Sequence, residues 1–172
     1  MSGNGRWKMA KITFIGGDDF GVRLERLGNM NARASVERAV AKAAGIVADA
    51  VRAALKAIPG RKDIFLWGGQ MLYGVLEREK EDLLDGLGIS PIQSDRNGFV
   101  HAKVGFDGYG SRQTKKYPKG TPNQLVAAAI ERGSSIRYKV PFIRPAVNKT
   151  RNKAIKAMDD SINEDIAAIF DE

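Results

Sequence analysis

The chain has 172 residues and a formal net charge of +8, and 43% of its residues are hydrophobic. This length and composition suit one domain with one core and argue against wholesale disorder. Because the chain has no cysteine, disulfides, zinc–thiolate sites and a cysteine nucleophile are excluded. No run of about 18 apolar residues is present, so we expect no transmembrane helix.

The first nine residues are expected to lie outside the fold. Residues 1–9 are mostly polar and lack the apolar stretch of a signal peptide, so they are predicted to form a disordered leader or an expression remnant. Residues 10–172 are then predicted to form a single domain. This domain is expected to begin with a β-prone strand at 11–15. A short helix follows the strand, and Asp18 or Asp19 is a suitable N-cap for it.

A long amphipathic helix is predicted from residue 31 to residue 58. Apolar residues recur there at spacings of three and four, and charged residues fall between them. The apolar stripe consists of Val36, Val40, Ala43, Val47, Val51, Ala54 and Ile58. Its small side chains would let a partner helix or sheet approach closely, and Pro59-Gly60 ends the helix.

The next stretch, residues 61–86, is densely charged. Residues 64–67 fit either a strand or a buried loop, whereas the part after them is predicted to be an exposed helix. Its acids alternate with Arg78 and Lys80, which is typical of a solvated helix face. These acids are Glu77, Glu79, Glu81 and Asp82.

An antiparallel hairpin is predicted from residues 87–92 and 99–106. The turn between them contains Asn97-Gly98, which tolerates the positive φ that tight hairpins require. Pro91 indicates that its strand lies at an edge or a bulge.

Two more helices are predicted after a Gly-rich, basic loop. Thr121 is expected to cap the first of them, with Pro122 in its first position, and Gly133 is expected to end it. An extended segment follows, and Pro145 is expected to open the last helix. The apolar stripe of that helix consists of Ile155, Met158, Ile162, Ile166 and Ile169.

This order of elements predicts an α+β fold. Helices and antiparallel strands are mixed without a repeating βαβ order. We therefore expect a small antiparallel sheet packed against a long N-terminal helix and a C-terminal helix.

Catalytic chemistry has little support in the sequence. With one histidine, His101, and no cysteine, a transition-metal site would need carboxylates almost alone. The Gly-rich stretch 105–110 lacks the GxxxxGK[ST] pattern of a phosphate loop, and we interpret it as a flexible loop anchored by aromatic residues. We therefore predict a protein that is not an enzyme and that has no metal or cofactor.

The positive charge is concentrated in one segment. Residues 108–158 contain twelve Lys and Arg and one acid, Glu131, so this segment carries +11. Such asymmetry suits a surface that meets nucleic acid or an acidic protein. Interleaved Tyr and Lys can stack on bases and pair with phosphates, and Tyr also suits protein interfaces, so both alternatives stay open. The predicted interface or DNA-facing residues are Tyr109, Arg112, Lys115, Lys116, Tyr117, Lys119, Arg137, Lys139 and Arg144.

Two expectations concern local structure in this basic segment. The loop 108–120 has few aliphatic anchors, so it is expected to be mobile in the isolated protein. Between Pro141 and Pro145 the chain is restricted. We expect Phe142 to point into the core and Arg144 to meet a carboxylate or carbonyl groups.

The order of motifs from residue 87 to residue 147 resembles a known family. A hairpin is followed by Lys-Val-Gly-Phe-Asp-Gly-Tyr-Gly at 103–110, by Glu-Arg-Gly at 131–133 and by Pro-Phe-Ile-Arg-Pro-Ala at 141–146. This order is similar to that of the putative tail-component, or tail-completion, family of long-tailed phages and prophages. Residues 61–86 depart from the family, whose members usually carry a shorter segment there.

The resemblance implies a structural virion protein of the head–tail neck or tail, made in the host cytoplasm and without contact to a membrane. Family members assemble as rings, commonly hexameric, and can be monomers before docking. The implied partners are further copies of the chain, neighbouring neck and tail-tube proteins and, without sequence preference, the DNA in the channel. The alternative interpretation is a basic nucleic-acid-binding module without catalytic activity.

Overall fold

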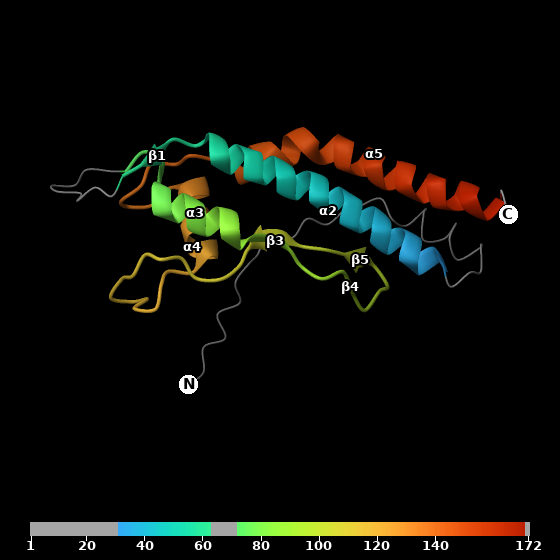
Figure 1. Ribbon diagram of the computed structural model, residues 1–172, viewed down its shortest axis with the longest axis horizontal. Coiled ribbons are helices and arrows are strands. Elements are labelled where there is room, and N and C mark those ends of the chain that lie inside the picture. Colours follow the sequence, from blue (N-terminus) through green and yellow to red (C-terminus); the bar gives the residue numbers. More distant parts are fainter. Residues whose placement is uncertain (1–30, 63–71, 171–172) are drawn as a thin grey trace.

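The computed structural model describes residues 31–62 and 72–170, which form an elongated α+β arrangement (Figure 1). The helices in this part of the chain are α2 (Asn31–Ala57), α3 (Glu77–Gly86), α4 (Asn123–Arg132) and α5 (Ile143–Phe170). The strands are β1 (Gly60–Arg61), β2 (Val75–Leu76), β3 (Leu87–Ile89), β4 (Gln93–Ser94), β5 (Val100–His101) and β6 (Val104–Phe106). The expected leader, the strand at 11–15, the helix after it and residues 64–67 lie outside the described residues.

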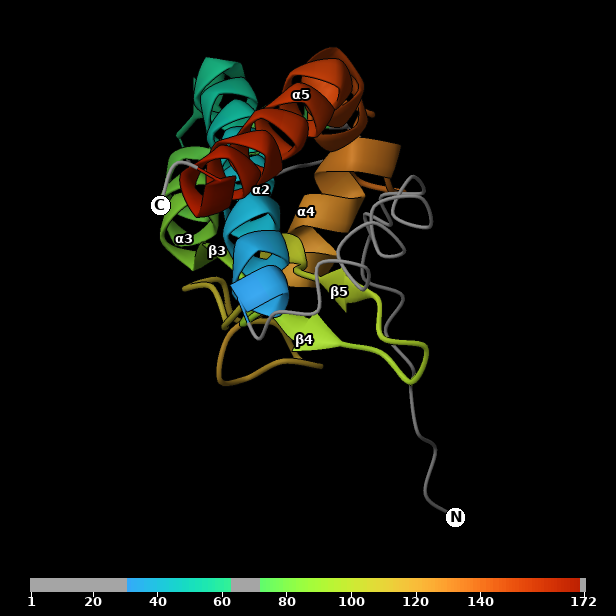
Figure 2. The same ribbon diagram turned by 90° about the vertical axis from the view of Figure 1, so that its right-hand side faces the viewer.

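The two long helices α2 and α5 pack side by side along their lengths (Figures 1 and 2). They run antiparallel, since Arg38 near the start of α2 pairs with Asp165 near the end of α5. The α2 face toward the core has the predicted small, apolar character, and Ala43 on α2 and Ala154 on α5 are both fully buried. Small side chains at these positions allow the two helix backbones to approach closely.

Part of the predicted stripe on α5 is wrong. Ile155 is an exposed residue, whereas Ala154, Ser161 and Ile162 are buried. Ile162 is buried as predicted, and Ala154 and Ser161, each one residue before a predicted position, are buried as well. The helix also begins at Ile143, two residues before Pro145, which therefore lies in its first turn.

The predicted antiparallel hairpin is confirmed. Strands β3 and β6 pair with Leu87 opposite Phe106, and β4 and β5 pair with Gln93 opposite His101. The two ladders are separate, and Pro91 lies in the interruption between β3 and β4. The turn has Gly98 at φ +82°, the conformation predicted for it. A parallel pair of β1 with β2 was not predicted.

One apolar core joins the helices and the hairpin. Helix α2 lies between α5 and the antiparallel strands, and its contacts reach both (Figure 1). Leu83 of α3, Phe106 of β6, Ile130 of α4 and Phe142 before α5 are all buried in one cluster with the α2 stripe from Ala43 onward. The rings of Phe106 and Phe142 have centroids 6.0 Å apart. The expected inward position of Phe142 is therefore confirmed.

The far end of the helix pair carries a pH-sensitive contact. Burial by itself raises the pKa of Asp165, but hydrogen bonds from Arg38 and Ser35 and the charges of Arg38 and Lys42 lower this pKa below its ordinary value overall. Because the folded-state pKa is depressed, the stabilisation is present above the unfolded pKa of about 4 and is lost as the pH falls through the folded value.

Replacing Asp165 by Asn is expected to lower the free energy of unfolding at neutral pH by at most about 1 kcal/mol, because the pair with Arg38 is partly exposed. The difference from the wild type should shrink as the pH falls below about 4. Urea unfolding at several pH values measures this difference in unfolding free energy. Glu164→Gln is the matched control, since Glu164 is 72% exposed and lies 3.7 Å from Lys42. A constant difference between wild type and Asp165→Asn down to the acid limit would contradict the assignment.

Candidate functional site

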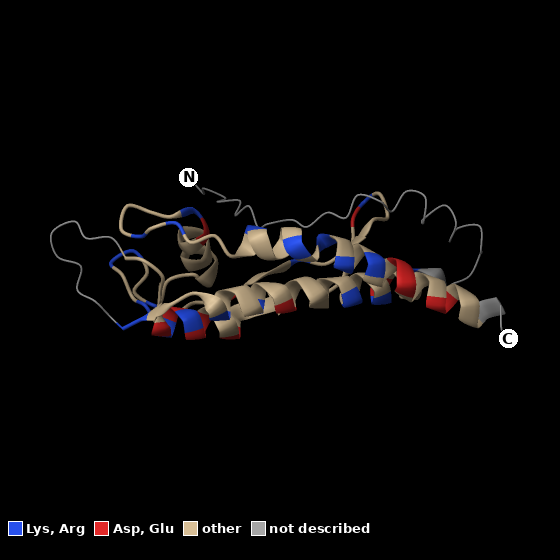
Figure 3. Cartoon of the chain, turned by 90° about the horizontal axis from the view of Figure 1, so that it is seen from above, with Lys and Arg blue, Asp and Glu red and all other residues tan. Residues whose placement is uncertain are grey.

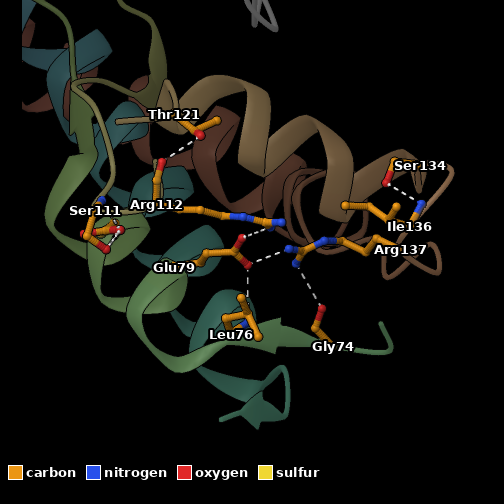
Figure 4. Close-up of polar contacts among 10 residues, drawn as sticks. Gly74, Leu76, Glu79, Ser111, Arg112, Thr121, Ser134, Ile136 and Arg137 are labelled. Carbon is orange, nitrogen blue, oxygen red and sulfur yellow. Dashed lines mark hydrogen bonds and ion pairs between the residues drawn. The ribbon is translucent and has the colours of Figure 1, made fainter. Parts of the chain in front are cut away.

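The most distinctive polar feature is a buried ion pair between α3 and the segment that follows α4. Glu79 and Arg137 are 2% and 3% exposed, and Arg137 Nη2 lies 2.5 Å from Glu79 Oε2 (Figure 4). Arg137 Nη1 also donates to the carbonyl of Gly74 at 3.2 Å. The Glu79 carboxylate further accepts the backbone N–H of Leu76 at the start of α3. These contacts give the buried carboxylate and guanidinium hydrogen-bond partners in place of water.

A second arginine extends this ion pair toward the surface. Arg112 comes from the Gly-rich loop, and its Nη1 lies 2.8 Å from Glu79 Oε1. Its side chain is 31% exposed, so it covers the buried pair from outside. One carboxylate thereby joins three segments that are far apart in the sequence: α3, the loop and the segment after α4 (Figure 4).

Residues 107–122 are held against α3 by polar contacts. Asp82 Oδ2 accepts the backbone N–H of Ser111 at 2.7 Å and its hydroxyl at 2.8 Å. Asn123, at the start of α4, donates from Nδ2 to the carbonyls of Asp82 and Asp107. These polar anchors were not predicted; the mobility of the loop in the isolated protein stays a prediction. Tyr109 is 70% exposed.

A side chain at Gly110 would crowd the contact of this loop with α3. A Cβ on Gly110 would lie 2.8 Å from Asp82 Oδ2 and 3.0 Å from Asn123 Oδ1, which is closer than side chains ordinarily pack. The base of the loop is closed by backbone bonds from Gly110 to Thr121 and from Thr121 to Arg112. The Thr121 hydroxyl donates to the Arg112 carbonyl, so it does not cap α4 as predicted. The N-cap position of α4 is Pro122.

A second carboxylate, that of Glu131, caps the long helix α5. Glu131 lies in the last turn of α4. Its Oε2 accepts the N–H groups of Phe142 and Ile143 at 2.7 and 2.8 Å, and its Oε1 accepts that of Arg144 at 3.1 Å. The first N–H groups of a helix have no partner within it, and the helix dipole favours a negative charge there. The Glu-Arg-Gly and Pro-Phe-Ile-Arg-Pro-Ala motifs are thus joined by one side chain.

Replacing Glu131 by Ala is expected to lower the free energy of unfolding by about 1–2 kcal/mol, because three N–H groups lose a charged acceptor. Glu131→Gln keeps an acceptor oxygen without the charge and should lie between Ala and wild type. Chemical denaturation measures both variants. Glu164→Ala, an exposed acid near the other end of α5, is the control. Equal stability of Glu131→Ala and wild type would contradict the capping role.

The structure separates the predicted interface residues into two groups. Arg137 is buried, so it does not belong to an exposed patch, and Arg112 is committed to Glu79. The neighbours of Arg137 are not buried with it: Ile136, in the turn closed by Ser134 and Arg137, is 47% exposed, and Tyr138 is 52% exposed. The exposed members are Tyr109, Lys115, Lys116, Lys119, Lys139 and Arg144, with Tyr117 half-buried.

One predicted contact, that of Arg144, differs in detail from the expectation. Arg144 meets a carboxylate through its backbone N–H and not through its guanidinium, which is exposed. Lys116 Nζ lies 5.6 Å from the centre of the Tyr117 ring, within the range of a cation–π contact.

The described residues contain no group of three or more His, Cys, Asp and Glu side chains that could hold a metal ion. His101 Nδ1 lies 3.4 Å from the carbonyl of Phe99. In this part of the chain, no helix combines the length and apolar character that crossing a membrane requires. The polar clusters around Glu79, Asp82 and Glu131 instead join segments of the fold to one another.

Comparisons with known family models, curated proteins and solved structures found no match to this chain. The interpretation of the chain therefore depends on its motifs and on the geometry described above.

One central residue of the site, Glu79, was missed by sequence reasoning. Glu79 was assigned to a solvated helix face, which is wrong. A usable signal was its spacing, since Glu79 lies four residues before the buried Leu83 and three after the buried Leu76. An acid at an apolar position of a helix predicts a buried cationic partner, but the spacing does not indicate which one.

Proposed function

We propose that the chain is a structural virion protein of a long-tailed phage or prophage. In this proposal it forms part of the head–tail neck or of the tail-completion ring during tail assembly and joining. The observation that carries the proposal is the cap of α5 by Glu131, which gives a physical role to the two motifs that resemble the family. The loop before these motifs is likewise tied to α3 and α4 by Asp82 and Asn123.

The exposed aromatic residues of the domain suit an assembly role. Tyr73, Tyr109, Tyr138 and Phe99 are each about half or more exposed, from 48% to 70%. Aromatic side chains are enriched at protein interfaces because they bury a large area at low entropy cost. Further copies of the chain and neighbouring neck and tail-tube proteins are the partners that we propose for them.

The test is to disrupt the gene in the phage or prophage that encodes the chain and to inspect the lysate by electron microscopy. We expect filled heads and separate tails, or tails with an open head-proximal end, and recovery when the wild-type chain is supplied in trans. Labelled antibody against the chain should bind at the neck of intact particles. Normal particles in its absence, or no chain in purified virions, would contradict the proposal.

The second candidate function is a basic nucleic-acid-binding module. It is favoured by the exposed basic residues Arg144, Lys149, Arg151 and Lys153 in the first half of α5. This module would bind DNA without a place in the virion, so the antibody experiment separates the two functions.

A further inference from the structure

Helix α5 has two electrostatically different halves. Its first half carries basic residues and no acid up to Met158, whereas Asp159, Asp160, Glu164 and Asp165 lie in its second half. In Figure 3 the helix that leads to the C-terminus is correspondingly blue along its first half and red toward its end. Two of these acids face basic residues of α2: Asp165 pairs with Arg38, and Glu164 lies 3.7 Å from Lys42.

Of the five basic residues in the first half, only Lys156 has an acidic partner, Asp160 one turn further along α5. Arg144, Lys149, Arg151 and Lys153 are all exposed. Within the described residues no side-chain ion pair or hydrogen bond involves these four side chains. The acid closest in sequence, Glu131, is occupied with the backbone N–H groups at the start of the helix. Four unpaired cations thus lie within ten residues of one helix.

These cations flank a polar ridge. At about 100° per residue, Arg144 and Arg151 form one row along the helix and Lys149 and Lys153 form a second row on the other side of its exposed surface. Asn148 and Asn152 lie between the rows and are also exposed. We name the surface made by these six residues the α5 basic face. Arginine, lysine and asparagine side chains are all hydrogen-bond donors that suit phosphate oxygens.

We propose that the α5 basic face binds the phosphates of duplex DNA without sequence preference. Charge complementarity favours this partner: duplex DNA carries one negative charge per about 1.7 Å, so it presents many phosphates along the roughly 20 Å of this half-helix. An acidic protein is less suited, because protein interfaces have an apolar centre and are depleted in lysine. Ile155, at 38% exposure, is the only large hydrophobic side chain counted as exposed on α5 within the described residues.

This face differs from the patch predicted from the sequence, which centred on the loop 108–120. Part of that charge is neutralised, since Arg112 and Arg137 both pair with Glu79. Lys115, Lys116 and Lys119 remain exposed on the loop. The inference requires no ring formation, so it can hold or fail independently of the proposed function.

The test is fluorescence anisotropy of the full chain with a short labelled duplex of mixed sequence over a range of salt concentrations. One variant combines Lys149→Gln, Arg151→Gln and Lys153→Gln. The matched control combines Lys115→Gln, Lys116→Gln and Lys119→Gln, which removes the same number of charges from the loop. Circular dichroism melts check that both variants fold. We expect the α5 variant to fold because exposed Gln is tolerated well in helices.

We expect wild-type affinity to fall steeply with salt. The α5 variant should bind at least about tenfold more weakly at about 0.1 M salt, with a log–log salt slope smaller by about two to three. The loop variant should lose less than about threefold, because screened charges away from the contact contribute little. Equal losses in the two variants, or no duplex binding by the wild type at low salt, would overturn the proposal. The proposal would also be overturned if polyglutamate bound the α5 basic face as tightly as DNA does, because this would indicate an acidic protein partner.

Discussion

Replacing Glu79 by Ala is expected to lower the free energy of unfolding by about 3–5 kcal/mol, the largest effect of removing any single acidic charge among the described residues. The substitution leaves the Arg137 guanidinium, which is 3% exposed, buried without a counter-charge. It also removes the acceptor of Arg112 and of the Leu76 N–H. Urea denaturation followed by circular dichroism measures the change.

The controls separate burial from helix effects. Glu77→Ala and Glu81→Ala change exposed acids on the same helix and should cost less than about 0.5 kcal/mol. Arg112→Ala should cost less than Glu79→Ala, because Arg137 still neutralises the carboxylate. The double variant Glu79→Leu/Arg137→Met should recover much of the lost stability, since an apolar pair avoids the desolvation penalty of a buried ion pair. A Glu79→Ala variant as stable as Glu77→Ala would contradict the buried pair.

Replacing Phe142 by Ala is expected to cost about 3–5 kcal/mol, because it removes a fully buried ring and leaves a cavity. Phe142 is 3% exposed and packs against Phe106, where α5 begins beside the hairpin. Urea denaturation followed by circular dichroism measures the change in unfolding free energy, and a thermal melt gives the change in melting temperature. The melting temperature should fall by several degrees for each 1 kcal/mol in a chain of this size.

Phe142→Leu is the matched variant, because it keeps most of the apolar volume and should lose less stability than Ala. Tyr138→Ala is the external control, since Tyr138 is an aromatic residue of the same extended segment but is 52% exposed. An unchanged melt for Phe142→Ala would contradict its place in the core. A loss as large for Tyr138→Ala as for Phe142→Ala would indicate that the segment, and not the buried ring, sets the stability.

Several elements could be predicted from the sequence because local rules specify them. The apolar spacing of three and four residues predicted α2, and Pro59-Gly60 predicted where it stops. Asn97-Gly98 predicted the turn of the hairpin, and Gly133, with φ +82°, ends α4 as expected. In each case sterics and periodicity within a few residues determine the local backbone conformation, so it can be predicted without knowing any distant partner.

The candidate site could not be predicted in the same way, because its pairs join residues far apart in the chain. Glu79 and Arg137 are separated by 58 positions, and neither has a local feature that identifies the other. A charged side chain is stable when buried only if a counter-charge is placed beside it. The tertiary structure decides whether that happens. Burial consequently removed Arg137 from the predicted basic patch.

The sequence by itself determined the charge asymmetry, the long helices, the hairpin and the motifs that resemble the tail-completion family. Only the tertiary structure decided which of the many basic residues are free. Arg112 and Arg137 both pair with Glu79. The basic residues of the first half of α5, apart from Lys156, have no acid beside them, because Glu131 is turned toward the helix end. Net charge is a sum over residues, but an interaction surface depends on where each charge lies and on what pairs with it.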